Sequence, residues 1–247
     1  MASRDEILAH ARELLRLDAF PDYGPMGLQV AGAAEVTKIA CGVSASLELF
    51  QHARAVGAQL VLVHHGLFWN NESRVVDALL KARLQELFAG DLTLAAYHLA
   101  LDAHPELGNN ARLAQELGVE VDGSFGQVGL GGRLRVPESG DAFARRVAQL
   151  LNRQPIAFTY GKPLVERVAI SSGGAGRDLP QAAAEGYDLY LTGEPEEPSL
   201  HQAKELGIHF VAAGHYATER LGVQALGVRL AERFGLEWVF IELPNPV

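Results

Sequence analysis

Apolar positions in the first half of the chain fall into two kinds of pattern. Residues 39–43 and 60–63 are short, continuous apolar runs, and an alanine-containing amphipathic stretch lies between them at about 47–55. Continuous runs of this length are typical of parallel strands buried on both faces, and the stretch between them has the spacing of a helix. This part of the chain therefore predicts a β-α-β unit.

The same pattern returns further along the chain. Residues 36–66 and 165–195 pair without a gap over 31 positions, with identities that include Val36/Val165, Ala53/Ala182, Gly57/Gly186 and Leu62/Leu191. Chance similarity between two α/β segments is the alternative, since Ala, Gly and Val are common in such folds. The gapless length favours an internal duplication.

A second pairing extends the duplication. "AAYHLALD" (95–102) matches "AAGHYATE" (212–219), which places His98 on His215 and Asp102 on Glu219, and at the same offset "RLAQELG" matches "RLAERFG". We therefore predict an α/β protein of two similar halves, residues 1–122 and 123–247, with layered sheets and helices.

Composition narrows the class of protein. The net charge is −9, and no basic cluster marks a nucleic-acid-binding surface. No apolar stretch reaches the ~18 residues of a membrane span, and the N-terminus has no apolar signal-peptide core. The single cysteine, Cys41, lies in an apolar run and is expected to be buried. We expect a soluble cytoplasmic protein that binds neither nucleic acid nor membrane.

Histidines and carboxylates follow three of the predicted strands. His64 and His65 end the run in "LVLVHHGLFWN", His98 and Asp102 follow the next strand, and His215 and Glu219 follow its counterpart in the second half. Loops at the carboxyl ends of parallel strands build binding sites in such folds. Imidazole and carboxylate together suit Zn, Mn, Fe or Co. The alternative is a set of purely structural or surface histidines.

Several neighbouring segments have two possible roles. Asn109 or Asn110 is a candidate N-cap for the helix that follows, and "SSGGAGRD" (171–178) is either a tight turn or a phosphate cradle. Glu194, which aligns with His65, lies in the site or in a solvated acidic loop. Phe68 and Trp69 wall a pocket or, as we favour, pack between the halves or against another subunit. His104 either lines the site or orders its loop.

At these residues the chain resembles the Nif-three-like family, whose members are labelled GTP cyclohydrolase 1 type 2 homologs. "GLQV", "VHHGLFW", "YHLALDAHPELGNNARLA", "LTGE" and "AGHYATERLGVQAL" carry the resemblance, which runs from about residue 24 to the final "PNPV". It implies a duplicated α/β fold, a dinuclear centre of two divalent metal ions per chain, and a toroidal homohexamer with the sites facing its interior.

The resemblance also implies the ligands. They fall on His64, His65, Asp102, His215 and Glu219. His98 matches a histidine of the family motif that is not among its usual ligands, and we expect it either to support the ligands from behind or to act as a proton shuttle. Two positions depart from many members: Ser44 replaces an Asp, and Tyr216 replaces a His.

Two functions remain open from the sequence. The first is a metal-dependent hydrolase in which a metal-activated water attacks a small, nucleotide-like substrate. There, His64 and His215 bind mainly one ion and His65 the other, while at least one of Asp102 and Glu219 bridges them. The second is a non-enzymatic metal-handling or regulatory scaffold that uses the same ligands.

Overall fold

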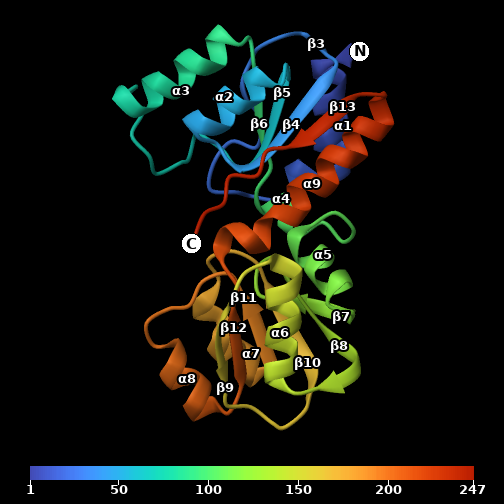
Figure 1. The fold of residues 1–247 in the computed structure, drawn as a ribbon, viewed down its shortest axis with the longest axis vertical. Coiled ribbons are helices and arrows are strands. Elements are labelled where there is room, and N and C mark those ends of the chain that lie inside the picture. The colour runs from blue at the N-terminus through green and yellow to red at the C-terminus, as the bar shows by residue number, and fades with distance from the viewer. The chain divides into compact units, whose positions relative to one another are not determined.

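The computed structural model describes all 247 residues, which form two compact units. The first unit contains Met1–Leu107 together with Gly222–Leu243, and the second contains Gly108–Leu221 together with Pro244–Val247. Each unit is a mostly parallel or mixed sheet with helices packed on both faces (Figure 1). This layered α/β architecture confirms the predicted fold class.

The sheet of the first unit has five strands in the order β13-β4-β5-β6-β2. The first four are mutually parallel and β2 is antiparallel to β6. Their bounds are Glu237–Phe240 (β13), Lys38–Ser44 (β4), Leu60–His65 (β5), Thr93–Ala96 (β6) and Gly27–Val30 (β2). A separate antiparallel pair joins β1 (Ala2–Ser3) to β3 (Glu35–Val36).

Alternate residues of these strands enter two different cores. Ile39, Cys41, Leu60 and Leu62 pack with α1 (Arg4–Leu15) and with the later part of α9 (His215–Phe234). The intervening residues Ala40, Val61 and Val63 pack with α2 (Leu47–Ala55) and α3 (Ala78–Ala89) on the other face. The alternation follows from the period of two in a strand, and it buries Cys41 as expected.

The second unit has a six-stranded sheet in the order β7-β8-β10-β11-β12-β9. The strands are Val119–Phe125 (β7), Gly129–Glu138 (β8), Val165–Ser171 (β10), Leu189–Thr192 (β11), His209–Ala212 (β12) and Ile156–Thr159 (β9). β10, β11 and β12 are parallel, as buried apolar runs predict, and β8 and β9 add antiparallel partners on either side.

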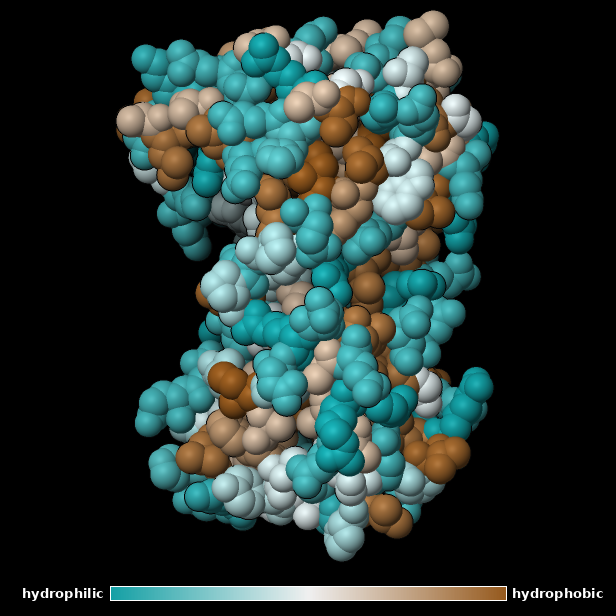
Figure 2. Space-filling model, viewed as in Figure 1, coloured by the Kyte–Doolittle hydropathy of each residue, from teal (hydrophilic) through white to brown (hydrophobic).

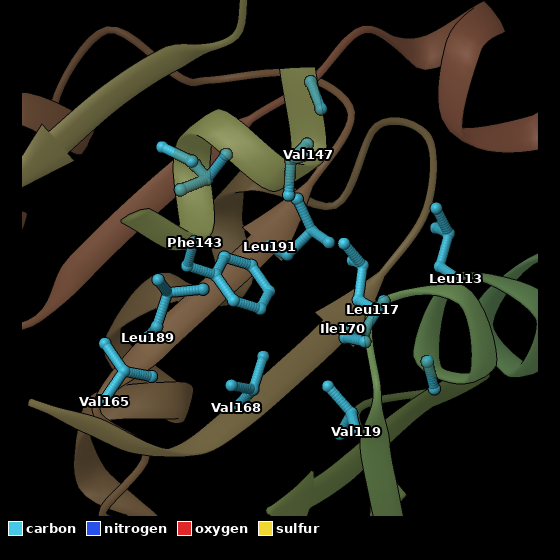
Figure 3. Close-up of a cluster of buried hydrophobic side chains, with 14 of the residues drawn as sticks. Leu113, Leu117, Val119, Phe143, Val147, Val165, Val168, Ile170, Leu189 and Leu191 are labelled. Carbon is cyan, nitrogen blue, oxygen red and sulfur yellow. The ribbon is translucent and has the colours of Figure 1, made fainter. Parts of the chain in front are cut away.

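Two helices cover each face of this second sheet. α5 (Asn109–Glu116) and α6 (Gly140–Leu151) pack on one face, where Leu113, Phe143, Ile170 and Leu191 meet in a buried cluster (Figure 3). α7 (Leu179–Ala184), preceded by the 3₁₀ turn η2 (Gly176–Asp178), and α8 (Ser199–Leu206) pack on the other.

The repeated sequence segments adopt corresponding elements. β4, α2 and β5 of the first unit follow one another as β10, η2 with α7, and β11 do in the second. β6 and β12 are then the next parallel strand in each sheet. β2 and β9 complete the correspondence, because each pairs antiparallel with that strand at the edge.

The helices that follow β6 and β12 are exchanged between the units. α5 follows β6 in the chain but belongs to the second unit, and α9 passes into the first unit at Gly222. The matched motifs "RLAQELG" and "RLAERFG" thus lie in opposite units from the strands that precede them. The predicted halves 1–122 and 123–247 describe the repeat along the sequence, and that boundary stays a prediction.

Side chains with capping oxygens begin three of the helices. Ser46, Asp77 and Ser139 each accept a hydrogen bond from a backbone N–H in the first turn, at 3.2, 2.8 and 3.2 Å respectively. These contacts satisfy donors that the helix itself leaves unpaired.

Polar residues cover most of the visible face of both units (Figure 2). None of the helices combines the length and the apolar character that crossing a bilayer demands.

Candidate metal centre

The parallel register of β5 and β6 brings the first group of histidines together. Val63 pairs with Ala96, and Tyr97 N donates a hydrogen bond to Val63 O at 3.0 Å. Continuing this register sets His64 and His65 beside Tyr97 and His98, just where the strands end. Adjacent histidines on one strand end therefore meet a third histidine from the next strand.

The three imidazole rings form a compact cluster within the first unit. The ring centroids of His64 and His65 are 4.8 Å apart, and those of His98 lie 5.0 and 5.5 Å from them. One nitrogen from each ring lies within 4.8 Å of the other two. His64 is fully buried, while His65 and His98 are partly exposed. The cluster thus offers several nitrogen ligands to one small volume.

Each of these rings has its Nδ1 atom engaged by a different partner. His64 Nδ1 donates to Tyr97 O at 2.9 Å, and His65 Nδ1 lies 3.1 Å from Ser44 Oγ. His98 Nδ1 lies 2.8 Å from a carboxylate oxygen of Asp22. A ring whose Nδ1 is held in this way presents Nε2 as the metal-binding or proton-accepting atom, in a fixed orientation.

Asp102 adds a carboxylate to this cluster. It is the last residue of α4 (Leu99–Asp102), a single short turn that begins directly after His98. Its side chain is buried, and Oδ2 lies 3.4 Å from His64 Nε2. His98 is the N-cap of this turn and Asp102 is its last residue, so one short element carries both.

Asp22 is a component that sequence reasoning missed. It lies in the loop between the 3₁₀ turn η1 (Leu17–Ala19) and β2, far from His98 in the sequence. Burial raises the pKa of its carboxyl, but the hydrogen bond and charge of His98 and two backbone N–H donors outweigh burial, so the pKa is lowered overall. Asp22 is therefore an anion that faces the His98 ring at neutral pH.

The second unit contains its own histidine–carboxylate group at the start of α9. His215 Nδ1 is hydrogen-bonded to Glu194 Oε1, and His215 Nε2 lies 3.0 Å from Glu219 Oε2. Burial lowers the pKa of His215, but the two carboxylates outweigh it and raise the pKa to about 9. His215 thus repeats the arrangement of the first unit, with Nδ1 held by one group and Nε2 facing a ligand candidate.

The glycine-rich turn packs against this second group. A Cβ atom on Gly173 would lie 2.1 Å from Glu219 Oε1, and its φ of +67° is in the left-handed region. Gly173 N donates to Thr218 Oγ1 at 3.0 Å, which ties the turn to α9. "SSGGAGRD" is thus a tight strand-to-helix turn whose missing side chain makes room for the Glu219 carboxylate.

The predicted cap at Asn109 or Asn110 is wrong. Gly108 is the N-cap of α5, and both asparagines are buried in its first turn. Asn110 Oδ1 instead accepts from Ser172 N at 2.7 Å, and its Nδ2 donates to Val128 O at 3.0 Å. Asn110 therefore holds the glycine-rich turn in place. Because the first turn of α5 is buried, it does not offer an exposed site for an anion.

Two other residues have clear positions. Trp69 lies edge-on to His98 with ring centroids 5.2 Å apart, and 6.3 Å from His65, so it walls the histidine cluster. His104 orders its own loop, because Nδ1 accepts hydrogen bonds from Glu106 N and Leu107 N at 3.2 and 3.1 Å.

The donor set in each unit suits a divalent transition metal. Imidazole nitrogens and carboxylate oxygens are the usual ligands of zinc, manganese, iron and cobalt in proteins. The Nδ1 partners are of the kind that orient such ligands from behind: a backbone carbonyl, a hydroxyl and two carboxylates. Both groups therefore fit metal binding in donor chemistry and in orientation.

Comparison with known proteins identifies the family of the chain. The model of the Duf34/NIF3 (NGG1p interacting factor 3) family matches residues 2–246. The chain belongs to the DUF34/NIF3 family. The resemblance drawn from its motifs is thereby confirmed.

Relatives and solved structures cover nearly the whole chain. A Pseudomonas aeruginosa protein named GTP cyclohydrolase 1 type 2 homolog is 47% identical over 91% of both chains, and an Escherichia coli protein of the same name is 45% identical over 95% of both. The solved structure titled protein ybgI, of unknown function, is 43% identical with a TM-score of 0.97 over 100% of both chains. TTHA1606 from Thermus thermophilus is 38% identical with a TM-score of 0.93 over the same share.

Proposed function

We propose that this DUF34/NIF3 protein holds two divalent metal ions and hydrolyses a small, nucleotide-like substrate. The proposed ligands are His64, His65 and Asp102 from the first unit and His215 and Glu219 from the second. The observation that carries the proposal is the shared arrangement of the histidines, in which a fixed partner on Nδ1 directs Nε2 toward the other donors. That the two donor groups serve one centre is implied by the family resemblance.

Metal ions bound by these ligands would supply a water of lowered pKa as the nucleophile and polarise the bond that it attacks. The residues of the chain have separate tasks. His64, His65 and His215 would hold the ions through imidazole nitrogens, and Asp102 and Glu219 would hold them through carboxylate oxygens. His98 accepts the proton from the nucleophile, because its Nε2 is held among the other imidazoles. Trp69 shields one side of that ring from water.

Elemental analysis tests the metal content directly. After reconstitution with zinc, manganese, iron or cobalt, the wild-type protein should hold two equivalents per chain. His64→Ala and Glu219→Ala should each lower that content by about one equivalent or more, since each removes a buried ligand. His52→Ala and His201→Ala, at exposed helix positions, are matched controls that should leave it unchanged.

A screen of hydrolysable nucleotides and phosphoesters with the reconstituted protein tests the reaction. Activity should disappear on chelation while the protein stays folded by circular dichroism. The proposal is refuted when His64→Ala combined with Glu219→Ala leaves both metal content and hydrolysis unchanged. Two bound metals without hydrolysis of any substrate would instead support the metal-handling scaffold.

Two broader proposals remain. The chain assembles into a homohexamer, as the family resemblance implies, and it works in the cytoplasm, as its sequence composition leads us to expect.

A further inference from the structure

We propose that Asp22 is the positioning residue of this centre: its one carboxylate both fixes the His98 ring and anchors the turn that carries Asp102. The structural part of the proposal concerns contacts within the first unit. Only the use of His98 and Asp102 beside bound metal rests on the proposed function.

Three donors converge on the Asp22 carboxylate. Oδ1 accepts from Tyr23 N at 2.7 Å and faces His98 Nδ1 at 2.8 Å, while Oδ2 accepts from Leu99 N at 2.9 Å. The side chain of Asp22 is only 2% exposed. Water cannot readily replace it, and a buried acceptor surrounded by donors is costly to remove.

The bond to Leu99 explains why α4 begins where it does. α4 has four residues, too few to be stable without tertiary contacts, and its N-cap His98 makes no side-chain capping bond. Asp22 Oδ2 satisfies the first N–H of the turn in place of that cap. Asp22 thereby holds in place the short element whose last residue is Asp102.

The bond to His98 sets which ring nitrogen carries the proton. A carboxylate accepts but does not donate, so Nδ1 is protonated and Nε2 has the lone pair. Nε2 is also the nitrogen that the ring can offer to the cluster with His64 and His65. The same bond restrains rotation of the ring, which also lies edge-on to Trp69.

Asp22→Asn distinguishes positioning of His98 from simple occupation of space, because asparagine keeps the size of the side chain. The amide has one acceptor atom where the carboxylate has two. If that oxygen stays on Leu99 N, the amide NH₂ faces His98 Nδ1 and forces it to accept, which moves the proton to Nε2. If the amide turns over, the NH₂ faces the Leu99 N–H and the cap of α4 is lost.

The tautomer of His98 is read by nitrogen-15 NMR of the histidine rings in the metal-free protein at about pH 9, well above the ordinary imidazole pKa. We expect the wild type to carry its proton on Nδ1. Asp22→Asn should exchange the protonated and unprotonated nitrogen shifts of His98 or make the ring average between tautomers. Asp18→Asn is the matched control, since Asp18 is an exposed carboxylate near the same loop bonded only to Arg12, and it should leave the His98 shifts unchanged.

Two results would overturn the proposal. One is a wild-type spectrum with the His98 proton on Nε2, a measurement that needs no variant and so stands even if Asp22→Asn does not fold. The other is a folded Asp22→Asn protein whose His98 shifts equal those of the wild type. Failure of the proposed function has a different signature, because a protein that binds no metal would still show the tautomer change.

Discussion

At the scale of single residues, the hydrogen-bond partners of the two ring nitrogens distinguish structural histidines from candidate metal ligands. His209 has both nitrogens occupied by backbone groups: Nε2 donates to Lys162 O at 2.7 Å, and Nδ1 accepts from Gly161 N at 3.3 Å. His64 and His215 also have Nδ1 engaged, by Tyr97 O and by the Glu194 carboxylate respectively, but they turn Nε2 toward a carboxylate. A histidine with two backbone partners braces a fold, whereas one with a carboxylate at Nε2 can exchange a proton for a metal ion.

The protonation of His215 makes the stability of the metal-free protein depend on pH. Its folded-state pKa of about 9 lies above the ordinary value of 6.5. Protonated His215 therefore contributes its full stabilisation to the folded state below about pH 6.5, and this contribution is lost as the pH rises toward 9. We expect the melting temperature of the metal-free protein to fall across that interval.

Glu194→Gln tests the source of this shift. An amide removes one of the two negative charges beside His215, so the pKa should move down toward its ordinary value and the pH dependence should weaken. NMR titration of His215 and melting curves measure both effects. Replacing the charged Nδ1 partner with a neutral amide should also weaken metal binding about 10-fold or more. Glu197→Gln, in the same exposed loop, is the control, and an unchanged His215 titration in Glu194→Gln would contradict the assignment.

At the scale of elements, the strand-to-helix turns determine where the candidate ligands fit. The duplication aligns Ser44 with Gly173. In the first unit Ser44 contacts His65 Nδ1, and in the second the absence of a side chain at Gly173 admits Glu219. The same position of the repeat thus supports the site by different means in the two units.

Gly173→Ala should damage the centre more than an ordinary glycine substitution. Alanine at a left-handed φ costs about 1–2 kcal/mol by itself, and here its Cβ would also displace the Glu219 carboxylate from a distance of 2.1 Å. Gly207→Ala is a closely matched control, because its φ of +63° is similar and no atom lies within 4 Å of the added Cβ.

Chemical denaturation and metal titration separate the two effects. Both variants should lose stability for backbone reasons, but only Gly173→Ala should also lose metal affinity. Equal metal affinity in the two variants would show that the turn does not support Glu219.

Periodicity was sufficient to predict these elements but not all of the contacts between them. The apolar runs predicted β4, β5 and their counterparts, because buried parallel strands leave a continuous signal. The histidines at strand ends were identified for the same reason. Asp22 was missed because it is a loop residue whose partner, His98, lies 76 positions away in the chain. Asn110 was misread because a capping residue and a bracing residue look alike in sequence.

At the scale of the whole molecule, the two compact units are not consecutive pieces of the chain. Gly222–Leu243 returns to the first unit and supplies β13 and the buried residues Val223, Leu226 and Leu230. Gly108–Leu117 is in turn part of the second unit, where Leu113 and Leu117 enter the core. Sequence similarity marks the duplicated segment, but it does not reveal which of the two units the helix that follows joins.

This exchange predicts which parts of the chain can fold alone. Residues 1–122 lack β13 and the three side chains from α9, each of which contributes about 1.5–3 kcal/mol by burial. The sum is comparable to the whole stability of a small domain. We expect residues 1–122 to lack cooperative unfolding.

Residues 1–107 joined to 222–243 should fold, since Leu107 and Val223 belong to the same buried cluster and a Gly/Ser linker of about 10 residues can span them. Denaturant unfolding followed by circular dichroism compares the two chains. Cooperative unfolding of 1–122 together with failure of the joined chain would show that the exchanged helix is dispensable.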